Sequence, residues 1–140
     1  MRIQVHNRQR KIRIDLGALR AFAANALGEV LGLMRERSAL ASLPSVDVYL
    51  VSDRTIAELH RRFMQIAGPT DVITFQHGEI FISPETTRRN ARRFAIDAAT
   101  ELERCLLHGL LHLHGYDDST SAAARMMERV QEQLLARLRI

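Results

Sequence analysis

The stretch CLLHGLLHLHG, residues 105–115, constrains the fold more than any other part of the sequence. Its leucines fall on several sides of a helix, which is typical of a helix buried in a protein core. Thr100 and Glu103 have the spacing of a capping box, which predicts where this helix begins, and Gly115 predicts where it ends. The sequence therefore predicts a central helix that the rest of the chain covers.

The remaining pattern alternates short β-prone segments with amphipathic helices. Helices are predicted from Asp15 to about residue 34, from the helix-start pair Ser52–Asp53 or a Thr55/Glu58 capping box to about Met64, after the Ser83–Pro84 pair, and over residues 121–138. The β-prone segments are residues 3–5, 12–14, 45–51, 71–75 and 79–83. We expect residues 1–140 to form a single α+β domain, with a small mixed four-stranded sheet and about five helices.

Composition sets the class of protein and the range of partners. The net charge is +4, and every basic residue except Lys11 is an arginine. Guanidinium groups bind phosphate oxygens, so nucleic acid is an allowed partner, although an ordinary solvated surface explains the same charge. No apolar run is long enough for a membrane span, the first residues do not resemble a signal sequence, and Cys105 is the only cysteine. We expect a cytoplasmic protein with no membrane partner; its oligomeric state stays open.

Two histidines of the predicted core helix have the spacing of metal ligands. His108 and His112 are four residues apart, so both imidazoles lie on one face of the helix. Gly115 allows a sharp turn, after which Asp118 can return to the same point. Two imidazoles and one carboxylate leave the fourth position of a zinc ion open, as in catalytic zinc sites. The alternative is that these are ordinary polar residues on a histidine-rich helix.

Neighbouring residues leave some alternatives open. Cys105 lies on the same helix face and is either a thiolate ligand or, more simply, a small buried side chain. Asp117 is either a supporting acceptor or the ligand in place of Asp118. His114 is expected at the surface or behind the ligands. Gly109 stands where zincin proteases have their general base, glutamate, so peptide hydrolysis is disfavoured.

The segment HGLLHLHGYDD resembles the H-G-x-L-H-L-x-G-Y-D-H motif of the YbeY family of bacterial endoribonucleases. The segments PTDVITF (69–75), GEI (78–80) and VSDRTIAELH (51–60) are also similar to that family. The resemblance implies a metal-dependent endonuclease for single-stranded RNA that acts in small-subunit ribosomal RNA maturation and ribosome quality control. It also implies a Zn²⁺ site with ligands His108 and His112, and as partners the small ribosomal subunit or its assembly factors.

The chain departs from the family pattern at two functional positions. Asp118 stands where the family has its third histidine, which adds a negative charge and weakens the pull of the metal on bound water. Met64 stands at the family's arginine in L-N-x-x-Y-R, so Arg61 and Arg62 become the candidates for phosphate contact. Arginines 88, 89, 92 and 93 form either a track for RNA or a solvated helix face. A non-catalytic assembly factor that keeps the metal is therefore the alternative function.

Overall fold

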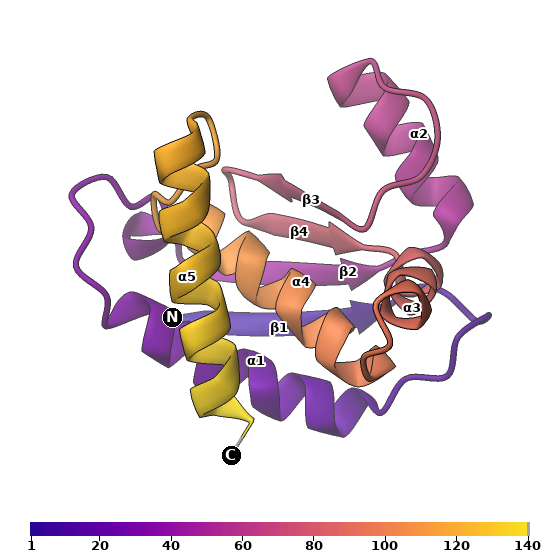
Figure 1. The fold of residues 1–140 in the computed structure, drawn as a ribbon, viewed down its shortest axis with the longest axis horizontal. Coiled ribbons are helices and arrows are strands. Elements are labelled where there is room, and N and C mark those ends of the chain that lie inside the picture. Colours follow the sequence, from indigo (N-terminus) through magenta and orange to yellow (C-terminus); the bar gives the residue numbers. More distant parts are fainter. Residues whose placement is uncertain (140) are drawn as a thin grey trace.

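A four-stranded mixed sheet forms the centre of the molecule in the computed structural model, which describes residues 1–139 (Figure 1). The strands are β1 (Arg2–Asn7), β2 (Ser45–Leu50), β3 (Val72–Phe75) and β4 (Glu79–Ile82), in the order β1-β2-β4-β3. β2 runs parallel to both β1 and β4, whereas the edge strand β3 is antiparallel to β4. The tight connection at Gly78 joins β3 to β4, since Gly78 N–H donates to Phe75 O.

Three long helices lie on one side of this sheet, the first two against the strands and the third against those two helices (Figure 1). They are α1 (Leu16–Leu31), α4 (Ala98–Leu113) and α5 (Ser121–Leu138). Their apolar residues and the alternate residues of the strands that point toward them, such as Val48 and Ile80, form one core cluster. The shorter α2 (Asp53–Met64) and α3 (Pro84–Arg93) follow the ends of β2 and β4, and a 3₁₀ helix spans Leu40–Ser42. The α+β prediction is confirmed.

The predicted core helix is α4, and it packs against α1, α3, α5 and the strands β3 and β4. Gly109 lies at the closest approach to the sheet, because a Cβ there would be 2.9 Å from two Ile80 carbons and 3.1 Å from Thr74 Oγ1. Real Cβ atoms do not come that close to their neighbours, so glycine lets the helix axis approach the strands. This contact fixes the height of α4 over β4 and β3, and with it the position of the two histidines.

Two local predictions are wrong. Residues 12–14 form no strand, because Gln9 folds the chain into a turn by bonding to both backbone groups of Ile12. Asp97, rather than Thr100, caps α4 and accepts from Thr100 N–H, so this helix begins about a turn earlier than predicted. Of the two starts that the sequence offers for α2, the first is right, since Ser52 caps the helix and accepts from Thr55 N–H.

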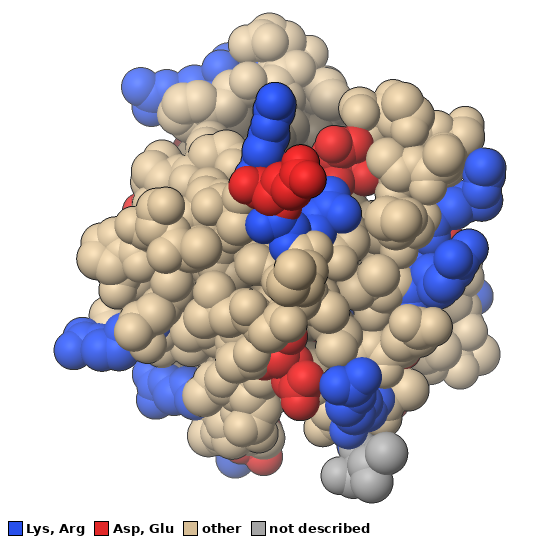
Figure 2. Space-filling view, turned by 90° about the vertical axis from the view of Figure 1, so that its left-hand side faces the viewer, with Lys and Arg blue, Asp and Glu red and all other residues tan. Residues whose placement is uncertain are grey.

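Charged side chains are dispersed on the face of the molecule shown in Figure 2. Lysine and arginine side chains lie around its periphery, and acidic groups stand beside arginines near its middle. The net charge of +4 is therefore not gathered into one basic patch on this face. Among the described residues, no helix has the length and the apolar composition that crossing a membrane requires.

Candidate metal centre

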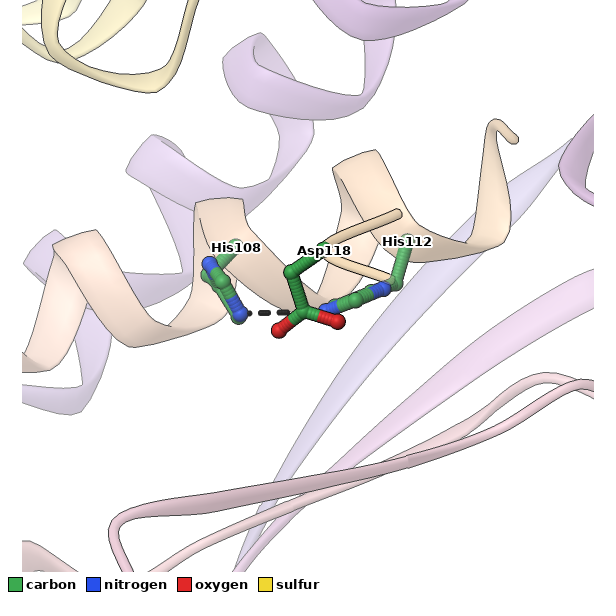
Figure 3. A group of neighbouring side chains, drawn as sticks. All are labelled: His108, His112 and Asp118. Atoms are coloured by element: carbon green, nitrogen blue, oxygen red, sulfur yellow. Dashed lines mark hydrogen bonds between the residues drawn. The ribbon is translucent and has the colours of Figure 1, made fainter. Parts of the chain in front are cut away.

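His108 and His112 point their Nε2 atoms at each other from successive turns of α4. The two nitrogens are 3.1 Å apart and the rings are inclined at 81° (Figure 3). Two nitrogen lone pairs at this distance repel each other unless a proton or a metal ion lies between them. Two nitrogens that bind one zinc ion at about 2.0–2.1 Å with a tetrahedral angle lie about 3.3 Å apart. The spacing of the pair therefore fits shared coordination.

Asp118 reaches the histidine pair because the chain turns back after α4. Gly115 has a φ of +95°, and a Cβ at this position would be 2.1 Å from Arg37 O, so only glycine fits this turn. Arg35 holds the turn from outside, since it donates to Gly115 O at 2.8 Å and stacks on the Tyr116 ring. The carboxylate of Asp118 then lies beside both imidazoles (Figure 3).

These three side chains offer donor atoms that all lie within 4.8 Å of one another. Two nitrogens and one oxygen are ordinary ligands for zinc, and the oxygen also suits harder divalent metals. His108 and Asp118 line a cavity of about 480 Å³ between α4 and α5, which leaves room for a substrate group beside the ligands. The donor set and its open side therefore fit a catalytic metal better than a closed structural one.

The environment keeps His112 in the form that binds metals. Burial lowers the pKa of His112, and the neighbouring His108 lowers it further, while Asp118 acts in the opposite direction. A lowered pKa means that the ring is neutral at physiological pH, and only the neutral imidazole has a lone pair to give.

The structure separates the residues whose roles the sequence left open. Asp117 accepts hydrogen bonds from the backbone and hydroxyl of Ser119, and it is Asp118 whose carboxylate lies within 4.8 Å of both histidines' donor atoms, so Asp118 is the aspartate of the cluster. Cys105 is buried and lies 3.7 Å from Asp71 Oδ2, in a separate group. Asp71 itself ties down the entrance of β3 through a 2.8 Å bond from Val72 N–H.

His114 was expected at the surface or behind the ligands, and the surface position is wrong. Its side chain is buried, with Nδ1 2.7 Å from Ser38 Oγ and Nε2 2.8 Å from Leu33 O. The backbone N–H of His114 still donates to Leu110 O, as in the helix, so the side chain is buried because the segment after α1 covers it. It anchors the segment that follows α1 and lies outside the metal cluster.

The predicted phosphate-binding arginines lie on α2. Arg61 and Arg62 are exposed and line a shallow hollow with Thr55, Glu58 and Leu59. They are not among the residues that line the cavity beside His108, so their contact with phosphate stays a prediction. Met64 is 43% exposed on the same turn. In the arginine-rich α3, Arg89 is already paired with Asp53 at 2.7 Å, so it is less free to hold RNA.

Sequence reasoning missed three polar residues beside the site: Arg104, Gln131 and Glu132. Gln131 Oε1 lies 2.7 Å from His108 Nδ1, and Glu132 links Gln131 to Arg104. One signal was present, because Gln131 lies four residues from both Met127 and Leu135 on the buried face of α5. A glutamine in an apolar stripe needs a hydrogen-bond partner, and here the partner is the metal-binding helix.

A family model, curated relatives and a solved structure were found to be similar to this chain. The family model described as endoribonuclease YbeY matches residues 4–139. An endoribonuclease YbeY from Parabacteroides distasonis is 38% identical over 92 residues, which cover 61% of this chain and 65% of that protein, slightly under two thirds of its length. One from Moorella thermoacetica is 34% identical over 131 residues, which cover 80% and 84%. A solution structure of a Thermotoga maritima protein matches 97% of this chain and 88% of its own, with a TM-score of 0.67 and 28% identity.

Proposed function

Because this chain belongs to the endoribonuclease YbeY family, we propose that it is a zinc-dependent endoribonuclease that cleaves single-stranded RNA. The observation that carries the proposal is the convergence of His108, His112 and Asp118 on one point beside an open cavity. We further propose that its substrate is small-subunit (16S) ribosomal RNA, that it contributes to ribosome quality control, and that its partners are the small subunit or its assembly factors. The reaction then takes place in the cytoplasm.

The metal ion and the protein side chains have different roles in the proposed reaction. His108, His112 and Asp118 would hold a divalent metal ion, which would supply Lewis-acid chemistry toward the phosphodiester and would lower the pKa of bound water. The imidazoles of His108 and His112 bind as neutral donors, and Asp118 adds one negative charge. That charge reduces the electrophilicity of the centre relative to three histidines, so we expect slower but not absent cleavage.

Phosphate binding depends on arginines that remain free to donate. Arg104 lines the cavity, but its guanidinium already donates to Glu132 through Nε and Nη2 and to Glu101 through Nη1. It is therefore committed to the protein. Arg61 and Arg62 are exposed and carry free donor groups, which supports their assignment as the residues that hold the RNA backbone.

Two other functions make different demands on the same site. A non-catalytic assembly factor would keep the metal and lose cleavage, and Met64 in place of an arginine is the observation that favours it. A zincin-type protease would need a glutamate at position 109. A Cβ at position 109 would lie 2.9 Å from two Ile80 carbons, so a glutamate there would force Ile80 or the helix to shift, which disfavours the protease.

The proposal is tested by metal analysis and by cleavage of an unstructured RNA, with protein prepared without an affinity tag. The wild type should contain about one zinc per chain and cleave the RNA, His112→Ala should lose both properties, and Asp118→His should cleave faster. Bound zinc without His112-dependent cleavage would leave the assembly-factor function standing. Digestion of unfolded protein instead of RNA would favour the protease.

A further inference from the structure

The Nδ1 atom of His108, on the side of the ring away from His112, contacts a single buried glutamine. Gln131 Oε1 lies 2.7 Å from His108 Nδ1, and the side chain of Gln131 comes from α5, across the helix interface. Gln131 is only 7% exposed. A neutral imidazole has one N–H, so the identity of the atom that faces Nδ1 decides where that proton lies.

The orientation of the Gln131 amide is set by its second contact. Its Nε2 donates to Glu132 Oε2 at 3.2 Å, and a carboxylate oxygen can only accept. The amide nitrogen is therefore directed to Glu132 and the amide oxygen to His108. Were the amide reversed, its oxygen would face the carboxylate oxygen of Glu132, which is repulsive.

Glu132 is in turn held by Arg104 on α4. Arg104 donates to both carboxylate oxygens of Glu132, at 2.9 and 3.0 Å, and also to Glu101. Although burial raises the pKa of Glu132, the hydrogen bonds from Arg104 and Gln131 hold it below its usual value. The carboxylate stays ionised, so its oxygens remain acceptors for the Gln131 amide.

We propose that Gln131 is a positioning residue that fixes the His108 proton on Nδ1, so that the Nε2 lone pair faces His112 and Asp118. The chain of contacts runs from Arg104 through Glu132 and Gln131 to His108, and it joins α4 to α5. This inference rests on the proposed metal site for its consequence, because a ligand held in the right tautomer binds metal more tightly than a free one. Loss of such a supporting partner costs about 10- to 100-fold in metal affinity.

The experiment replaces Gln131 with a side chain of similar volume that lacks the acceptor oxygen. Gln131→Met has a similar size but no amide oxygen, whereas Gln131→Glu retains an acceptor oxygen toward His108. Gln133→Met is the matched control, since Gln133 is an exposed glutamine on the same helix. The measurements are ¹⁵N NMR shifts of the His108 ring nitrogens in metal-free protein and zinc affinity by chelator competition.

In the wild type, His108 should show a protonated Nδ1 and an unprotonated Nε2. Gln131→Met should lose this preference and bind zinc about 10- to 100-fold more weakly. Gln131→Glu should keep the proton on Nδ1, because its carboxylate oxygen still accepts there although the contact with Glu132 is lost, and Gln133→Met should match the wild type.

Two results would overturn the inference: wild-type His108 protonated on Nε2, or Gln131→Met with unchanged ring shifts and unchanged affinity. If Gln131→Met fails to fold, the wild-type and Gln131→Glu spectra still decide the tautomer. A wild type that binds no zinc would instead overturn the proposed metal site, because the tautomer is read in metal-free protein.

Discussion

Two groups of three potential metal ligands lie along the same helix, and they differ in almost every other respect. The histidine cluster is His108, His112 and Asp118, and the cysteine cluster is Asp71, Glu101 and Cys105. Each has its donor atoms within 4.8 Å of one another, and each draws two residues from α4 and one from a neighbouring segment. By residue type and proximity alone, both qualify as metal sites.

The availability of the donor atoms separates the two clusters. In the cysteine cluster, Glu101 accepts from Arg104, Asp71 accepts from Val72 N–H, and burial raises the pKa of the Cys105 thiol well above its usual value. A thiol that stays protonated is a poor metal ligand, because the thiolate is the form that binds metals. In the histidine cluster, His108 and Asp118 line an open cavity, and a metal would satisfy the two Nε2 atoms that otherwise face each other. Accessible, unoccupied donors therefore identify the site better than their mere proximity.

The largest expected effect is the loss of zinc affinity on removal of His112, compared with removal of Cys105 from the other cluster. His112→Ala should weaken zinc binding on the order of 1,000-fold or more, because one of three ligands is lost. Cys105→Ala should change it by less than about twofold. Chelator competition measures both, and His77→Ala is the control for an exposed histidine outside both clusters. Equal losses in His112→Ala and Cys105→Ala would remove the distinction between the clusters.

The second effect concerns the turn that completes the histidine cluster. Gly115→Ala should lower the free energy of unfolding by about 3 kcal/mol or more, since it combines a positive φ with a Cβ against Arg37 O. Zinc affinity should fall as well, because Asp118 moves away.

The matched control for this turn is Gly28→Ala, where nothing lies within 4 Å of the new Cβ. That change should stabilise the helix by about 0.5–1 kcal/mol. Urea unfolding of both variants gives the comparison. A Gly115→Ala protein as stable as the wild type would show that the turn is not constrained.

Much of this architecture is readable from local sequence. The spacing of His108, His112, Gly115 and Asp118 predicts their convergence because helix geometry and one left-handed glycine are local properties. The strand at residues 12–14 failed because β-propensity does not supply a pairing partner, and the turn built by Gln9 lies closer.

Long-range contacts explain most of what the sequence did not show. Arg104 and Glu132 meet across 28 positions of the chain, so no periodicity reveals their pairing. The burial of His114 was missed because the residues that cover it, Leu33 and Ser38, lie 81 and 76 positions away in the chain. By contrast, Gln131 was visible as a polar residue in an apolar stripe, although its partner was not.

Substitution of His114 tests whether this histidine contributes to zinc binding or only to the stability of the fold. His114→Phe should lower the free energy of unfolding by about 2 kcal/mol, because Leu33 O is left without its buried partner. Zinc affinity should stay unchanged, since the donor atoms of the histidine cluster are intact. His77→Phe, at an exposed position, should alter stability by less than about 0.5 kcal/mol. Loss of zinc binding in His114→Phe at full stability would place His114 among the ligands.

The smallest expected effect is an alkaline loss of stability that originates in the cysteine cluster. Burial is the largest cause of the raised pKa of Cys105, and the negative charges of Asp71 and Glu101 add to it. Below the ordinary thiol pKa of about 9, folded and unfolded chains both hold the proton, so the thiol gives no pH dependence. Above it the unfolded thiol ionises while the folded one does not, and stability falls by up to about 1.4 kcal/mol per pH unit.

Urea unfolding from pH 7 to pH 10 measures this effect as the difference between the wild type and Cys105→Ala. Tyrosines, lysine and arginines titrate alike in both proteins, so the difference isolates the thiol. The stability of the wild type should decline relative to Cys105→Ala above pH 9, because only the wild type releases a proton from residue 105 on unfolding. Parallel curves over the whole range would mean that the folded thiol ionises as readily as the unfolded one. The cysteine cluster would then hold an accessible thiolate, and the contrast with the histidine cluster would disappear.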